Sequence, residues 1–152
     1  MTEPHFSLVV LCYRSGKNII PFVERLQRTL ARCNFSSELV LVGNYIEGSN
    51  DETPQVVKEL ADGLDNIRTV IRPKQGMMGW DMRMGLDAAR GTYIGVIDGD
   101  GQFPPESIDN SDVENIPRHS RRRSVSTPHL DSVQRNLQPA VRIQSSRHQL
   151  QT

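Results

Sequence analysis

Two carboxylates at the end of an apolar run, Asp98 and Asp100, are the residues whose types and spacing most clearly suggest chemistry. The run 93–98 is rich in branched residues, and Gly91 and Gly99 bound it, which predicts a buried strand. Side chains two positions apart on an extended chain point the same way, so both carboxylates could face one cation. Hard divalent ions such as Mg²⁺ often sit between one or two carboxylates and a substrate's phosphates. The pattern therefore predicts a metal site, although an acidic turn after a strand explains the same spacing.

The elements that must position this pair alternate between strands and helices. Strands are predicted, from apolar runs, at 6–13, 38–42, 67–71 and 93–98. Helices are predicted, from apolar residues three and four positions apart, at 18–32, 53–61 and 77–90. Thr53 is expected to cap the second helix, and Trp80, Met84 and Ala88 are expected to lie on one side of the third. This alternation indicates an α/β fold with a mostly parallel sheet, which binds ligands where its strands end.

The composition of the chain changes after Glu106. All eleven glycines and every aromatic residue precede position 107, whereas 107–152 holds seven arginines against four acidic residues. Its few apolar residues are scattered and cannot bury enough surface to offset chain entropy. We therefore expect one folded domain at 1–106 and a disordered tail at 107–152.

Several classes of function lack their sequence signals. The two cysteines, Cys12 and Cys33, form no metal-binding spacing and are compatible with a reducing compartment. No secretory signal or membrane span is visible, so a cytoplasmic location is expected. Neither GxGxxG nor GxxxxGK[ST] follows a predicted strand. The basic cluster 121–126 has no interleaved aromatic residue to stack bases, so a nucleic-acid partner is not expected.

Four segments in order along the chain resemble the family 2 glycosyltransferases, which are nucleotide-sugar enzymes with a GT-A fold. They are 8–19, 39–44, 74–91 and 97–106, the last of which holds an Asp-x-Asp motif followed by Gln-x-Pro-Pro-Glu. The similarity is greatest to the dolichol-phosphate-mannose-synthase-like branch. It implies a Rossmann-like nucleotide-diphospho-sugar transferase domain of which only the donor-binding part is present.

The resemblance implies that the motif binds a cation. Asp98 would contact the ribose or the metal, and Asp100 would ligate Mg²⁺ or Mn²⁺ bridging the diphosphate of a UDP- or GDP-linked sugar.

It also implies roles for residues near the ends of other strands. Tyr13 and Arg14 would lie beside the base and ribose, and Asn44 near the base. Lys74 and Arg72 could hold phosphate. The alternatives are a half-buried core aromatic for Tyr13, a plain turn residue for Asn44, and a solvated basic loop for Arg72 and Lys74. The family's acidic residues are replaced here by Ser15–Gly16 and Gly43–Asn44, which leaves the choice of nucleotide open.

The implied reaction is inverting sugar transfer to a polyprenyl phosphate or a glycan, the former met at the inner face of a membrane. Nothing after Glu106 resembles the region that supplies the family's general base, so we expect weak transfer or none. A truncated or frame-shifted end and a natural tail both explain 107–152. A non-catalytic nucleotide- or protein-binding module is the alternative function.

Overall fold

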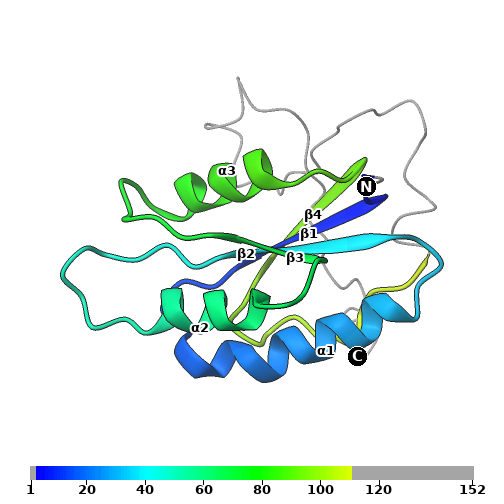
Figure 1. Ribbon diagram of the computed structural model, residues 1–152, viewed down its shortest axis with the longest axis horizontal. Coiled ribbons are helices and arrows are strands. Elements are labelled where there is room, and N and C mark those ends of the chain that lie inside the picture. The colour runs from blue at the N-terminus through cyan, green and yellow to red at the C-terminus, as the bar shows by residue number, and fades with distance from the viewer. Residues whose placement is uncertain (1–2, 111–152) are drawn as a thin grey trace, which may run out of the picture.

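The computed structural model describes residues 3–110 as three layers, with helices on both faces of a sheet (Figure 1). The strands described are β1 (Phe6–Leu11), β2 (Ser37–Val42), β3 (Ile67–Val70) and β4 (Tyr93–Asp98). The helices are α1 (Ile19–Ala31), α2 (Thr53–Ala61) and α3 (Met78–Ala88), with short 3₁₀ turns η1 (Gly16–Asn18) and η2 (Pro105–Ser107). None of the helices within 3–110 has the length and hydropathy of a membrane span. The predictions made for the tail lie, from residue 111 onward, outside the described residues.

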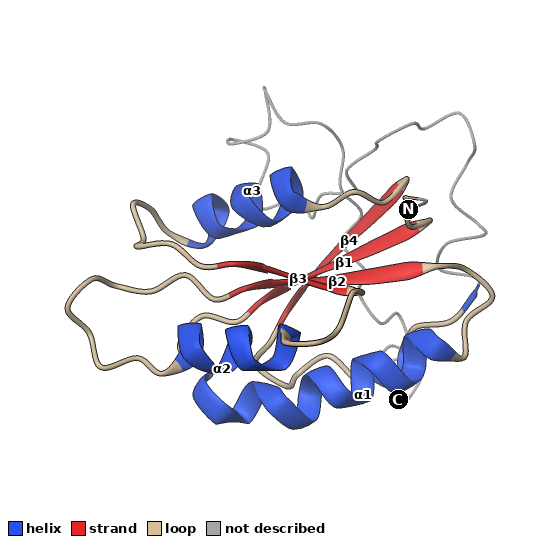
Figure 2. Cartoon of the chain, viewed as in Figure 1, coloured by secondary structure: helices blue, strands red, loops and turns tan. Residues whose placement is uncertain are grey.

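The strands pair in the order β3-β2-β1-β4, and every pair is parallel. The α/β fold with a parallel sheet is thus confirmed. Helices α1 and α2 cover one face and α3 covers the other, as the side view along the sheet makes plain (Figure 2). Because β1 lies between β2 and β4, Leu11 is opposite Val42 on one side and Asp98 on the other. The strands' carboxyl ends therefore meet at one edge of the sheet.

Alternate side chains of β1 enter two different apolar layers, which is why its sequence is apolar except for Ser7. Leu8 and Val10 pack with α1 and α2, and Val9 and Leu11 pack on the α3 side. All six residues of β1 are buried. Since burying one aliphatic side chain stabilises a fold by about 1.5–3 kcal/mol, the central strand is strongly fixed against both neighbours.

Helix α3 approaches the sheet closely through a glycine. Its buried residues are Asp81 and Gly85. Met84 and Ala88, as predicted, are partly buried against the apolar layer between α3 and the sheet. Trp80 belongs to neither core layer and lies against Gly76. The innermost line of α3 is thus one residue away from the one expected.

The segment after β4 folds back onto α1. Pro105 and Ile108 are buried there, and Arg25 of α1 donates two hydrogen bonds to the Glu106 carboxylate, of 2.7 and 2.6 Å. This contact lowers the pKa of Glu106 from 4.5 to about 2. The loop that carries Asp100 is therefore attached at both ends, to β4 and to α1.

We expect Gly85→Ala to destabilise the fold by ~1–3 kcal/mol, as overpacking does. A Cβ at this position would overlap Val9 Cγ1 and lie 2.9 Å from Val42 Cγ2. The matched control is Gly79→Ala in the same helix, where a Cβ meets nothing within 4 Å and alanine is favoured by up to ~1 kcal/mol. Urea unfolding measures both. Equal stability of the two variants would contradict the packing of α3.

We expect the Arg25–Glu106 pair to stabilise the fold in a pH-dependent way. Because the folded pKa of Glu106 is depressed, the contribution is present above pH 4.5 and is lost as the pH falls towards about 2. The effect is small, since both side chains are about half exposed. The Tm difference between the wild type and Glu106→Gln should shrink over this range, while the control Glu24→Gln, next to Arg25 on α1, should give no such trend.

Candidate functional site

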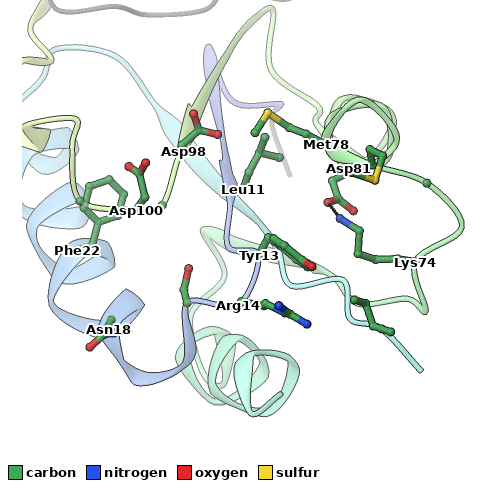
Figure 3. Close-up of a pocket in the computed structure, with 16 residues that line it drawn as sticks. Leu11, Tyr13, Arg14, Asn18, Phe22, Lys74, Met78, Asp81, Asp98 and Asp100 are labelled. Atoms are coloured by element: carbon green, nitrogen blue, oxygen red, sulfur yellow. Dashed lines mark hydrogen bonds and ion pairs between the residues drawn. The ribbon is translucent and has the colours of Figure 1, made fainter. Parts of the chain in front are cut away.

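A pocket of about 840 Å³ opens at the edge of the sheet where the strands end. It is lined by the loop after β1, the start of α1, the loop before α3 with the first turns of that helix, and the end of β4 (Figure 3). The pocket brings together five of the predicted site residues, namely Tyr13, Arg14, Lys74, Asp98 and Asp100.

Asp98 and Asp100 both line this pocket, from the end of β4 and the turn beyond it (Figure 3). Between them, Gly99 approaches the neighbouring elements so closely that a Cβ would lie 2.7 Å from Ile19 Cδ1 and 3.0 Å from the Leu11 carbonyl oxygen. The backbone N–H of Gln102 donates to Asp100 Oδ1 at 3.1 Å, which is a local turn bond typical of aspartate. The acidic wall is therefore built into the end of the strand.

The two carboxylates fit a divalent cation that is shared with a ligand. Within residues 3–110, no group of three or more His, Cys, Asp or Glu side chains is placed to hold a metal ion alone. Two carboxylate oxygen donors on one wall suit Mg²⁺ or Mn²⁺, which can complete their coordination with water and phosphate oxygens. A cation held by this pair would need water or an anionic ligand to complete its coordination.

The other side of the pocket carries an aromatic ring and two cations. Tyr13 is 45% exposed, so it is not the half-buried core aromatic of the alternative interpretation. Lys74 Nζ lies 4.1 Å from the centroid of its ring, and Arg14 Cζ lies 5.4 Å from it. Both distances are within the range of cation–π contacts.

Arg14 holds a strained backbone conformation, with φ +52°. A non-glycine residue in the left-handed region costs ~1–3 kcal/mol and persists only where its surroundings enforce it. The following turn is held by Gly16, whose N–H donates to Thr53 Oγ1 at 2.8 Å. Thr53 was predicted to cap α2, but it is Asp51 that accepts from the Thr53 N–H, at 3.0 Å, and from its hydroxyl, at 2.6 Å. The hydroxyl of Thr53 thus connects α2 to the loop that carries Arg14.

Asn44 and Arg72 are predicted site residues that do not line the pocket. Asn44 is buried (1% exposed), its Nδ2 donates to Asp81 Oδ1 at 2.9 Å, and its Oδ1 accepts from the Arg72 N–H at 2.9 Å. A direct contact with a base, expected from the resemblance, has no support in this position. Arg72 likewise contributes its backbone to this connection, and its side chain does not line the pocket.

Asp81 is a pocket residue that sequence reasoning missed. It is 4% exposed and forms an ion pair with Lys74, whose side chain is 11% exposed. The apolar spacing had placed the inner side of this helix at Trp80, Met84 and Ala88, whereas in the structure Asp81 and Gly85 are the buried residues. A charged residue on such a face requires a partner, and Lys74 is seven positions earlier.

Exposed apolar side chains complete the pocket. Ile46, Met77 and Met78 line it and are 43%, 84% and 53% exposed. The pocket therefore offers carboxylates for a cation, positive charge for an anion, and apolar and aromatic surface for a planar group.

Comparison with known proteins identifies the chain's relatives. An uncharacterized glycosyltransferase of Bacillus subtilis (strain 168), EpsJ, is 35% identical over 98 residues, which are 64% of this chain and 26% of that protein. A dolichol-phosphate mannosyltransferase of Mycosarcoma maydis is 28% identical over 111 residues, covering 70% of this chain and 37% of that protein. The chain thus spans well under half the length of these relatives.

A solved structure with a similar fold is the mannosyltransferase PcManGT from Pyrobaculum calidifontis, in complex with GDP-Man and Mn²⁺. The TM-score is 0.53 at 18% identity, covering 85% of this chain and 37% of that one. The model of the family described as glycosyl transferase family 2 matches residues 7–110. The predicted resemblance is thereby confirmed, and the chain belongs to glycosyl transferase family 2.

Proposed function

We propose that the pocket binds a nucleoside-diphospho-sugar together with Mg²⁺ or Mn²⁺, as the donor site for sugar transfer. The observation that carries this proposal is the presence of Asp98 and Asp100 in one pocket with Tyr13 and Arg14, in a chain of this family. The similar fold of a mannosyltransferase bound to GDP-Man and Mn²⁺ supports the choice of ligand and cation.

Each side of the pocket has its own task in this proposal. Asp98 and Asp100 hold the cation, which when bound neutralises charge on the diphosphate leaving group. The exposed guanidinium of Arg14 donates hydrogen bonds to phosphate oxygens, which its planar fork suits. Tyr13 offers its exposed ring to the base.

The acceptor is proposed to be a lipid phosphate or a glycan, reached at the inner face of a membrane in the first case. The names of the dolichol-phosphate mannosyltransferase relatives support the lipid phosphate. Transfer with inversion requires a base for the acceptor's proton, worth ~10²–10⁴-fold. Of the carboxylates lining the pocket, Asp81 is paired with Lys74, and Asp98 and Asp100 are assigned to binding the cation. Neither group is then available as the base. We therefore expect donor binding with weak transfer or none.

Within residues 3–110 the pocket holds no further carboxylate to act as the base, which also favours a second candidate, a non-catalytic module that binds a nucleotide or another protein. Titration with nucleoside diphosphates, with and without Mn²⁺, separates the two. Binding that is equally strong without the metal would favour the module.

We expect Asp98→Asn and Asp100→Asn each to weaken Mn²⁺-dependent binding of GDP and UDP by tenfold or more, or ~1.4 kcal/mol. The reason is that an amide cannot neutralise the cation. Isothermal titration measures the affinity. The matched control is Asp65→Asn, an exposed carboxylate just before β3 and outside the pocket. If all three variants bind as the wild type does, the proposed metal site is wrong.

We expect Arg14→Gly to leave the fold as stable as the wild type or to stabilise it by roughly 1 kcal/mol, because glycine adopts positive φ without strain. The same change should lower the affinity for GDP and UDP about tenfold, since a charged phosphate contact is lost. Thermal unfolding and titration measure the two effects. Arg14→Lys, which keeps the charge and the strain, should retain more affinity and gain no stability.

A further inference from the structure

We infer that Asp81 is a positioning residue that sets how strongly the pocket binds a nucleobase, by holding the ammonium of Lys74 over the ring of Tyr13. The inference rests on the proposed function. It assigns Lys74 and Asp81 to the base rather than to the phosphates.

Asp81 is anchored inside the protein. Its carboxylate pairs with Lys74 Nζ through Oδ2 (Figure 3). The same carboxylate is almost fully buried and accepts a hydrogen bond from Asn44 Nδ2 at 2.9 Å through Oδ1. A buried charge is strongly unfavourable unless it is paired and hydrogen-bonded. The carboxylate therefore keeps the ammonium in place.

Lys74 is also fixed through its backbone. Its N–H donates to the Tyr45 carbonyl at 2.7 Å, and Tyr45 forms a parallel bridge with Pro73. The Asn44 side chain that holds Asp81 also accepts from the N–H of Arg72 in the same loop. The backbone of Lys74 is thus tied to the loop after β2, and its ammonium is tied to α3 through Asp81.

The consequence of this anchoring falls on Tyr13. The ring is 45% exposed and stands on the loop after β1, where a side chain could adopt several rotamers. The ammonium of Lys74, 4.1 Å from the ring centroid, favours one of them. A ring held in advance of binding spares the ligand the entropy of ordering it.

The same pairing makes Lys74 a poor phosphate ligand. A phosphate could take the ammonium only by leaving the buried Asp81 carboxylate without its cation, which is costly. This departs from the expectation that Lys74 holds phosphate. Anion binding falls instead to Arg14, which is exposed and forms no salt bridge with any residue described, and to the cation on Asp98 and Asp100.

The test compares two probes in the presence of Mn²⁺, a nucleoside diphosphate (GDP or UDP) and inorganic pyrophosphate, which has no base. Asp81→Asn should lower nucleoside-diphosphate affinity about tenfold and should not lower pyrophosphate affinity, which the released Lys74 ammonium could even raise. A merely structural role for Asp81 would lower both affinities together. Equal losses for the two probes, or no loss for either, would overturn the inference.

A double-mutant cycle with Tyr13→Leu tests the route through the ring. Once the ring is removed, Asp81→Asn should have no further effect on nucleoside-diphosphate affinity. Independent, additive losses would mean that Asp81 acts by some other path.

Two further variants cover a failure of Asp81→Asn to fold. The pair Lys74→Met with Asp81→Asn removes both charges at once, leaves no buried charge unpaired, and should show the same selective loss. Lys74→Arg keeps a cation over the ring and should retain more nucleoside-diphosphate affinity than the pair Lys74→Met with Asp81→Asn. If the wild type binds neither probe with Mn²⁺, the proposed function fails and the inference with it. If the wild type binds both probes and the variants bind both as tightly as the wild type does, the inference alone fails.

Discussion

The parallel pairing of β1 with β2 and β4 is the constraint on which the pocket depends. Leu11 stands level with Val42 on one side and with Asp98 on the other, so the loops after three strands leave the sheet at the same height. A shift of one residue in the β1–β4 register would exchange the two faces of β4. Val96 and Ile97 would then exchange the apolar layers in which they pack, so side-chain packing on both faces of the sheet fixes where Asp98 is presented.

The sheet presents the loops, but other contacts shape them. Arg14 is held at positive φ by bonds made behind it, through Gly16 and Thr53. Asp100 stands on a segment whose far end is held to α1 by Arg25 and Glu106. Neither pocket residue, Arg14 nor Asp100, is part of the core. The position of each loop is fixed instead by hydrogen bonds that neighbouring residues of the loop make to other elements. This is the arrangement expected where strain or exposure at a site is supported by its surroundings.

The sequence was sufficient for the elements because apolar spacing reports burial directly. The run 93–98 and the carboxylates after it were predicted from pattern alone, and the strand is there. The inner face of α3 was misjudged because spacing favoured the large side chains of Trp80 and Met84. Close packing instead selected Gly85, whose missing side chain lets the helix reach Val9 and Val42. A pattern of apolar residues does not show where a small residue permits close approach.

The contacts among Asn44, Lys74 and Asp81 could not be predicted from the spacing of residues along the sequence, for a related reason. These residues come from three different segments, and only the order of the strands brings them together. From sequence, Lys74 counted as a positive charge available to phosphate. In the fold its charge is balanced by the buried Asp81 carboxylate, so the net charges of the pocket come from Arg14, Asp98 and Asp100. The charges that could meet a cation or an anionic ligand therefore lie with these three residues, whereas the Lys74–Asp81 pair lies beside the uncharged ring of Tyr13.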